Sequence, residues 1–233
     1  MMIQMRRAQD RGRFDFGWLD TRHTFSFGEY HDPQWSGFSV LRVLNEDRVR
    51  PGQGFGMHGH RDMEILSWVL EGAIEHRDSL GNGQVLRPGE IQRMSAGSGI
   101  RHSEFNPSAE SSLHFLQIWI VPKAPGGEPS YDQRMVDPAR LDGIFGLVAS
   151  PDGREGSVRI QQDATLSIAR LKAGGEASID MGPGRKAWVQ VSRGSAETAG
   201  MVVSAGDGMA VGEEIHLGFR ALEDSEILVF DLP

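Results

Sequence analysis

The stretch His58-Gly-His-Arg-Asp-Met-Glu-Ile-Leu-Ser-Trp-Val-Leu-Glu-Gly72 decides the fold of this chain. Two histidines stand at spacing i, i+2, an apolar run follows, and a glycine ends the stretch. On an extended strand alternate side chains share a face, so the imidazoles of His58 and His60 point to the same side. The run from Met63 to Leu70 predicts a buried strand, which a turn at Gly72 ends. The stretch therefore predicts β-structure that carries a pair of potential metal ligands.

Working outward, short apolar or alternating runs recur on both sides of this stretch. Glycine makes up 30 of the 233 residues, about 13% against a usual share of roughly 7%, and favours many tight turns. Turns recur roughly every eight to twelve residues, the spacing of a sandwich or barrel. In the first half the predicted strands are 23–27, 38–44, 63–70, 73–77, 84–87, 91–94 and 113–121, with a hairpin turn at 79–83.

The second half repeats this pattern after a Pro/Gly-rich connection. Strands are predicted at 158–161, 165–171, 177–181, 187–191, 208–211 and 226–230. The connection predicts one or two short helices between Tyr131 and Leu141, interrupted at Pro138. We therefore expect an all-β chain with two domains, 1–135 and 136–233. Aligning Gly72 with Gly194 places Asp180 and Gly182 opposite the two histidines, so the second copy lacks the pair.

Composition excludes several classes of protein. The formal net charge of −8, from 24 basic and 32 acidic residues, disfavours direct binding to nucleic acid, which requires a basic face. The arginines near the start, Arg6, Arg7, Arg11 and Arg13, are interpreted as a solvated segment. The absence of cysteine excludes disulfides, thiolate metal sites and a cysteine nucleophile. With neither a secretory signal nor an apolar run of membrane-spanning length, we expect a cytoplasmic protein without membrane partners.

A second pair of potential ligands, His102 and Glu104, repeats the i, i+2 spacing in another extended segment. Antiparallel strands of one barrel can bring this pair next to His58 and His60. Three imidazoles and one carboxylate suit a first-row divalent metal. No comparable pairing is evident for the other histidines of the first half, His23, His31, His76 and His114. His114 is interpreted as a hydrogen-bonded histidine of a sheet, and His216 in the same way.

The spacing of these residues resembles the two cupin motifs. The first resemblance runs from Gly52 through the histidine pair and Glu64 to Gly72, with one extra residue before the last glycine. The second runs from Gly89 through Ser95, which stands where proline is usual, to His102 and Asn106, with a longer spacer before the histidine. Within the cupins, the amino-acid sequence is similar to that of the pirin family, in its bacterial quercetinase-like branch. The segments that carry this resemblance are 18–28, 58–65, 93–105 and 114–119.

The resemblance implies a bicupin, with two cupin barrels of the double-stranded β-helix, jelly-roll-like type in tandem and short helices in the connection. It implies one divalent metal in the N-terminal barrel, held by His58, His60, His102 and Glu104, and none in the C-terminal barrel. Fe(II) is the expected metal, with Ni, Mn, Co, Cu and Zn as alternatives that the same ligands accept. Glu64 can be a ligand in the cupin pattern, but here it is expected to support the site or the fold.

The resemblance also implies a function, a quercetin 2,3-dioxygenase that opens the central ring of the flavonol with O₂ and releases carbon monoxide. Glu104 is then the expected catalytic base for the substrate's 3-hydroxyl. Phe55, Met57, Phe105 and Phe115 are candidates to line the pocket. Two alternatives remain open: an iron-binding regulator that acts through protein partners without catalysis, and a cupin isomerase or oxygenase for another enol or phenol.

Overall fold

The structure, a computed structural model, describes residues 2–212 and 216–233. The chain forms two compact units. The N-terminal unit comprises 12–136 and 158–162, and the C-terminal unit comprises Met1–Arg11, Asp137–Ser157 and Asp163–Pro233. Three short 3-10 helices accompany the strands: η1 (Ala8–Asp10), η2 (Pro138–Arg140) and η3 (Arg154–Gly156). The expected all-β fold with short helices in the connection is confirmed.

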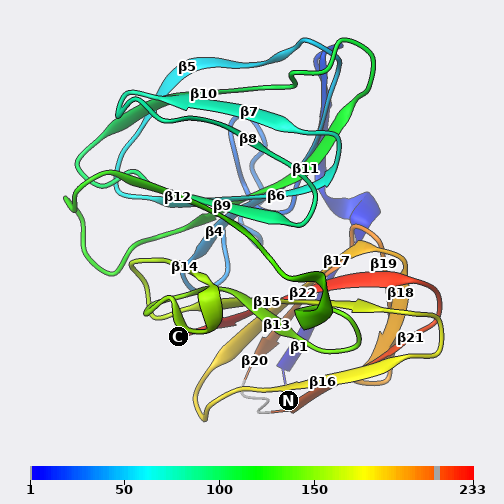
Figure 1. Ribbon diagram of the computed structural model, residues 1–233. Coiled ribbons are helices and arrows are strands. Elements are labelled where there is room, and N and C mark those ends of the chain that lie inside the picture. Colours follow the sequence, from blue (N-terminus) through cyan, green and yellow to red (C-terminus); the bar gives the residue numbers. More distant parts are fainter. Residues whose placement is uncertain (1, 213–215) are drawn as a thin grey trace. The chain divides into compact units, whose positions relative to one another are not determined.

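The N-terminal unit contains a seven-stranded sheet and a four-stranded sheet, which Figure 1 shows as two layers. The strand order in the large sheet is β12-β9-β6-β11-β4-β3-β2, and in the small sheet β5-β10-β7-β8. The large-sheet strands are β2 (Gly12–Asp15), β3 (Leu19–His23), β4 (Leu41–Val49), β6 (Glu64–Glu71), β9 (Glu90–Ser95), β11 (Leu113–Ile120) and β12 (Ser130–Met135). The small-sheet strands are β5 (Gly54–His60), β7 (Ile74–Asp78), β8 (Gly83–Leu86) and β10 (Ile100–Phe105), and the unit also includes β14 (Val158–Arg159).

The C-terminal unit repeats this arrangement. Its large sheet runs β1-β20-β17-β22-β15-β13 and its small sheet runs β16-β21-β18-β19. The large-sheet strands are β1 (Met2–Arg6), β13 (Gly146–Ser150), β15 (Thr165–Leu171), β17 (Lys186–Arg193), β20 (Gly208–Gly212) and β22 (Ser225–Leu232). The small-sheet strands are β16 (Glu176–Asp180), β18 (Ser195–Thr198), β19 (Met201–Ser204) and β21 (His216–Ala221). Each strand occupies the place of a counterpart in the first unit, so the predicted internal repeat is confirmed.

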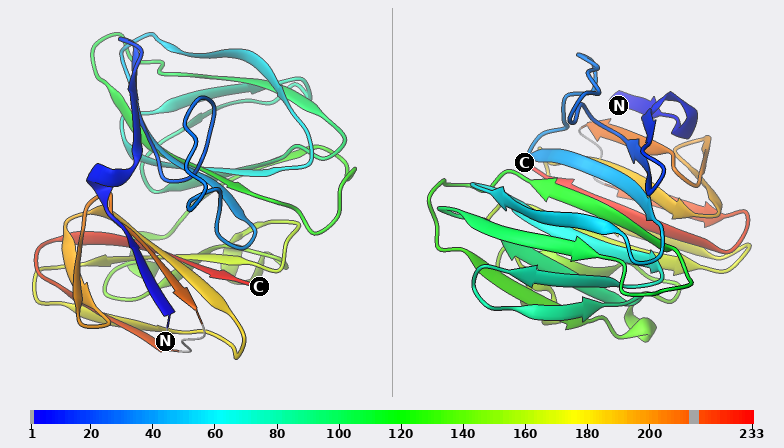
Figure 2. Two further views of the ribbon diagram at one scale, coloured as in Figure 1. Left: turned by 180° about the vertical axis from the view of Figure 1, so that it is seen from behind. Right: turned by 90° about the horizontal axis from the view of Figure 1, so that it is seen from above.

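The two units are not contiguous in the sequence. Strand β1 pairs with β20 of the C-terminal unit, in the place that β12 holds beside β9 in the N-terminal unit (Figure 2). Segment 158–162 belongs in turn to the N-terminal unit. The division of the chain into domains 1–135 and 136–233 stays a prediction. A single boundary cannot express that the first strand belongs to the C-terminal unit and segment 158–162 to the N-terminal unit.

The arginines near the start are not all solvated. Arg6 is 4% exposed and Arg11 is 7% exposed, while Arg7 pairs with Asp207 at 2.8 Å. The backbone N–H of Ala8 also donates to the Asp207 carboxylate, at 2.7 Å. The interpretation of this run as a solvated segment was therefore wrong, because pairing of β1 with β20 and the bonds to Asp207 fasten it to the C-terminal unit.

The structure also corrects the helix predicted between Tyr131 and Leu141. Residues 130–135 form strand β12, in which Tyr131 pairs with Met94 and Gln133 with Gln92 of β9. The only helical turn of this segment in the structure is η2, which starts at Pro138 after Asp137 accepts a hydrogen bond from the N–H of Ala139. Pairing with a neighbouring strand, which local sequence does not reveal, determines the conformation here.

The interior of the N-terminal unit is layered. One hydrophobic cluster contains Phe115 and Val69, and another contains Ile65 and Met94. Between them, on the same strands, lie Ser67 of β6, Gln92 of β9 and Gln117 of β11, which the register places side by side. We call these three residues the polar layer; each is less than one tenth exposed. Buried polar groups require hydrogen-bond partners, so three of them side by side indicate a polar site inside the barrel. No helix within residues 2–212 and 216–233 is long and apolar enough to cross a membrane.

We expect Gly72→Ala to lower the free energy of unfolding by about 3 kcal/mol, against roughly 1 kcal/mol for Gly81→Ala. Both glycines have positive φ, 79° and 89°. A Cβ at Gly72 would lie 2.8 Å from the carbonyl oxygen of Ser112, whereas nothing lies within 4 Å at Gly81. Urea titrations of both variants measure the difference, and equal losses would contradict the steric account.

Candidate metal centre

Strands β5 and β10 bring three histidines together. His102 of β10 is the direct partner of His58 in the antiparallel register, and Ile100 is the partner of His60. One nitrogen of each of His58, His60 and His102 lies within 4.8 Å of the other two. The structure therefore brings together the three histidines that the i, i+2 spacing predicted.

The imidazole of His58 is held with one nitrogen directed at His102. Its Nδ1–H donates to the carbonyl of Gly56 at 2.8 Å, which leaves Nε2 with a free lone pair. That Nε2 lies 3.1 Å from Nε2 of His102. Histidines that bind metals usually donate the other ring N–H to a carbonyl or carboxylate in this way. The side chain of His58 thus fits a metal ligand in both position and tautomer.

Burial keeps two members of this cluster, His60 and His102, uncharged. It lowers the pKa of His60 to about 4, with a further contribution from His58. Burial likewise lowers the pKa of His102 to about 2, with contributions from the neighbouring imidazoles of His58, His60 and His76. Neutral imidazoles have a lone pair available for a metal, so the donor set fits a divalent cation.

Glu104 lies on the same strand but in a second group of potential ligands. Its carboxylate is grouped with His76 and His102, not with His58 and His60. The β10–β5 register shifts between His102 and Glu104, so that Glu104 pairs with Phe55 of β5. His102 belongs to both groups and therefore links the predicted carboxylate to the histidine pair.

The carboxylate of Glu104 is 2% exposed and bonds to the opposite sheet. Gln117 donates to Oε2 at 2.8 Å, and the hydroxyl of Ser67 donates to Oε1 at 3.4 Å. Burial raises the pKa of Glu104 to about 7, the charge of Asp47 raises it further, and hydrogen bonds from the polar layer oppose the increase. The polar layer thus has a buried acid as its partner.

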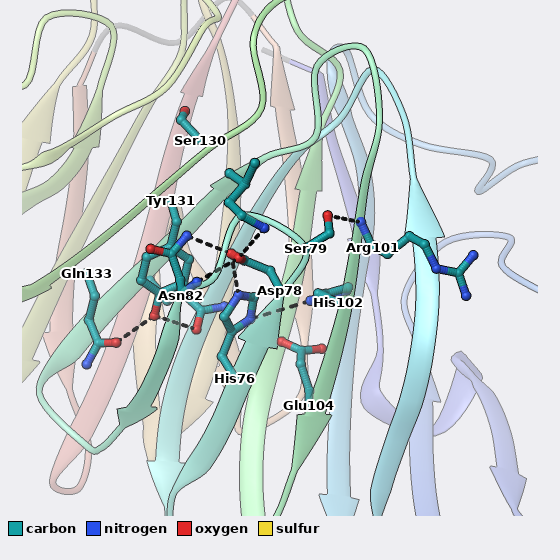
Figure 3. A network of polar contacts seen from close by, with 12 residues as sticks. His76, Asp78, Ser79, Asn82, Arg101, His102, Glu104, Ser130, Tyr131 and Gln133 are labelled. Carbon is teal, nitrogen blue, oxygen red and sulfur yellow. Dashed lines mark hydrogen bonds and ion pairs between the residues drawn. The ribbon is translucent and has the colours of Figure 1, made fainter.

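Sequence reasoning missed His76, which is fully buried beside His102. Their Nδ1 atoms lie 3.5 Å apart, and Nε2 of His76 contacts Asp78 at 3.1 Å (Figure 3). Asp78 also accepts hydrogen bonds from Asn82 and the N–H of Leu80, at 2.9 Å each. The statement that His76 lacks a partner was therefore wrong. The signal was present, because His76 and Asp78 repeat the i, i+2 spacing directly before a hairpin turn.

Glu64 lies elsewhere and supports the fold. Its carboxylate is 1% exposed, and Oε2 accepts hydrogen bonds from the hydroxyl of Ser95 at 2.8 Å and the backbone N–H of Gln161 at 3.2 Å. Among the described residues, neither group of potential metal ligands includes it. These contacts tie segment 158–162 to β6 and β9, in agreement with the structural role expected for Glu64.

The remaining histidines follow the sequence interpretation in part. His114 is buried and bonds through Nε2 to Glu46 at 2.9 Å, as expected of a hydrogen-bonded histidine of a sheet. His216 is exposed and contacts Asp180 at 2.7 Å. His114 is thus buried in a sheet, whereas His216 lies at the surface. Neither is in a group of potential metal ligands among the residues described.

A cavity of about 670 Å³ opens beside the histidines. His58 and His60 line it, together with Trp119, whose ring meets His60 edge-on with centroids 4.8 Å apart. Aromatic side chains form much of the wall: Phe14, Phe16, Trp18, Phe27, Phe55 and Trp119. Such a cavity has the size and apolar lining typical of sites for small organic ligands.

Of the four predicted lining residues, only Phe55 is in this wall. Phe115 packs in a hydrophobic cluster, and Met57 is exposed. The cavity lining does not include Phe105. The aromatic residues that sequence reasoning missed come mainly from 14–27, and the alternation of Phe14, Phe16 and Trp18 was the available signal.

Comparison with known proteins gives the family. The sequence profile of the Pirin family matches residues 4–120, and that of the quercetinase C-terminal cupin domain matches residues 147–232. A protein of Escherichia coli strain K12 named quercetin 2,3-dioxygenase is 47% identical over 234 residues, covering 100% of this chain and 99% of that protein.

Solved structures agree. YhhW from Escherichia coli superposes with a TM-score of 0.96 at 47% identity, covering 100% of this chain and 98% of that one. The bacterial pirin YhhW in complex with nickel(II) gives a TM-score of 0.95 at the same identity, covering 100% and 99%. Both units therefore have the cupin fold, and the chain belongs to the pirin family.

Proposed function

We propose that this chain is a metal-dependent dioxygenase of the quercetin 2,3-dioxygenase type. The observation that carries the proposal is the convergence of three imidazoles, two of which, His58 and His60, line an aromatic-walled cavity large enough for a flavonol. The relative from Escherichia coli with the same fold and 47% identity bears that enzyme's name. The reaction opens the central ring of the flavonol with O₂ and releases carbon monoxide.

We propose His58, His60, His102 and Glu104 as the metal ligands. Support comes from the lone pair of His58 directed at His102, from the lowered pKa values of His60 and His102, and from the grouping of Glu104 with His102. Fe(II) is our choice of metal, although Ni, Mn, Co, Cu and Zn suit the same ligands. The relative YhhW has been solved with nickel(II).

The metal ion, when bound, supplies Lewis acidity that stabilises the deprotonated 3-hydroxyl of the flavonol. Glu104 is proposed to accept the proton of that hydroxyl. Its pKa of about 7 makes it a suitable base near neutral pH, and burial excludes competing water. Because Gln117 donates to Oε2 at 2.8 Å, we expect Oε1, whose contact to Ser67 is longer at 3.4 Å, to bind the metal and, once released from it, to accept the proton.

The aromatic wall is proposed to hold the flavonol rings. Trp18 and Phe55 meet edge-on with centroids 5.2 Å apart, and Phe27 meets Trp119 in the same way at 5.3 Å. Contacts of this kind fix the rings of the wall, so a planar ligand enters a preformed cavity. Protein partners, a cytoplasmic location and the absence of nucleic-acid or membrane partners stay predictions from the sequence.

Metal-loaded protein incubated with quercetin in air is expected to release one carbon monoxide per flavonol consumed. In His58→Ala the release should fall to the level of metal-free protein, because a proposed ligand is lost. His216→Ala is the matched control, since this exposed histidine lies in the C-terminal unit. Absence of carbon monoxide from the loaded wild type would contradict the proposal and favour the non-enzymatic, partner-binding alternative.

The ligand assignment is tested with two buried carboxylates. We expect Glu104→Gln to weaken metal binding at least about 100-fold, because an anionic donor is replaced by an amide, and Glu64→Gln to change it less than about threefold. Elemental analysis after dialysis against a buffered metal solution measures both, with circular dichroism as the check on folding. Equal metal content in the two variants would contradict the assignment.

A further inference from the structure

The cavity holds a cluster of buried polar atoms without partners. Thr21 Oγ1, His23 Nδ1, Asn45 Oδ1 and Asp47 Oδ1 have no hydrogen-bond partner within the described part of the chain. We call Thr21, His23, Asn45 and Asp47 the acceptor cluster. All four line the cavity beside the metal centre, and none is more than 6% exposed. Unpartnered buried polar atoms cost stability, so several at one cavity require an explanation.

The strand register places these side chains on one face. Thr21 of β3 is the direct partner of Asp47 on β4, and His23 is the partner of Asn45. Asn45 is in turn the partner of Gln117 on β11, which bonds to Glu104 inside the barrel. Direct partners in a sheet point to the same side, so the acceptor cluster faces the interior and continues the row that ends at the metal centre.

The cluster offers acceptors more than donors. The free oxygens of Asn45 and Asp47 accept only, as long as Asp47 is ionised. His23 is uncharged, because burial lowers its pKa to about 4, and it bonds to the backbone of Phe27. Since Nδ1 has no partner, that bond uses the other ring nitrogen and leaves Nδ1 as an acceptor. Burial raises the pKa of Asp47 to about 7, while the Thr21 hydroxyl beside its carboxylate opposes the increase.

The complementary ligand supplies several O–H donors on a flat aromatic frame. A carboxylate or phosphate would face acceptors and the Asp47 side chain, so anionic groups do not fit this place. Phenolic hydroxyls do, since each can donate one hydrogen bond and accept another. The N–H of Trp119, also buried and unpartnered, adds one donor for a carbonyl or hydroxyl oxygen at the same cavity.

We propose that the acceptor cluster recognises the hydroxyl groups of the substrate remote from the reacting 3-hydroxyl, and so selects polyhydroxylated flavonols over flavonols that carry the 3-hydroxyl alone. This inference rests on the proposed function and adds the residues that discriminate among flavonols. A site built to bond a hydroxyl rejects an analogue without it, because the polar groups of the protein then stay buried and unpaired.

The same argument separates a role in binding from a role in folding. A buried hydroxyl that served the fold would have a partner, and its removal would destabilise the protein. Thr21→Val keeps the size of the side chain and removes an unpartnered oxygen. The variant should therefore melt at the same or a higher temperature than the wild type while binding the substrate less tightly, a known compromise between stability and function.

The test is an anaerobic titration of metal-loaded full-length protein with quercetin and with 3-hydroxyflavone, which lacks the remaining hydroxyls. We expect the wild type to bind quercetin at least about tenfold more tightly, and Thr21→Val and Asn45→Leu to reduce that ratio below about threefold. Arg48→Gln is the control, because this exposed residue follows Asp47 on β4 but faces outward. A ratio near one in the wild type, or an unchanged ratio in both variants, overturns the proposal.

The aerobic carbon monoxide assay on the same samples distinguishes the two claims. Selective binding without carbon monoxide supports the acceptor cluster and refutes the dioxygenase proposal. Carbon monoxide from both flavonols at equal efficiency refutes the cluster and leaves the dioxygenase. A melting temperature of Thr21→Val well below that of the wild type would show that the hydroxyl serves folding, and would also overturn the inference.

Discussion

The hydrogen bond from Gln117 to Glu104 is the interaction on which the site depends. It joins β11 of the large sheet to β10 of the small sheet, at 2.8 Å, inside the barrel. A carboxylate that is 2% exposed is tolerated only where donors or a cation meet it. The polar layer supplies the donors and the proposed metal supplies the cation. Burial in this interior also keeps His60 and His102 uncharged, so the structural and chemical roles of the layer are inseparable.

The C-terminal unit shows the same strands without this constraint. Its inward positions on β16 and β21 are apolar: Ile179 and Leu217 are direct partners, as are Ala177 and Phe219. Asp180, which alignment on the glycines places opposite His58, is exposed. The interior of the C-terminal barrel is therefore filled by hydrophobic side chains. In the N-terminal barrel, polar side chains replace part of that packing. This difference follows from a few inward positions, while the turns and strand order are shared.

The sequence was sufficient for those features that depend on local spacing. The strands around Trp68, the hairpin at 79–83 and the histidine pairs follow from periodicity and turn residues, and the structure has them. Features that depend on pairing between distant segments were not predicted from the sequence. Strand β1 joins β20 across some two hundred residues, and Tyr131 lies in a strand because β9 is beside it. The spacing of His76 and Asp78 was visible in the sequence, but only the β7–β10 register places His76 next to Glu104.

Anomalous diffraction from crystals of the metal-loaded protein, recorded at the absorption edge of the metal, tests the central claim most directly. The account predicts one peak per chain, inside the N-terminal barrel, with an imidazole nitrogen of His58, His60 and His102 and an oxygen of Glu104 about 2.0–2.2 Å away. It also predicts that Gln117 remains bonded to the second oxygen of Glu104. A peak held by His76 in place of the His58 and His60 pair, or one in the C-terminal barrel, would contradict it.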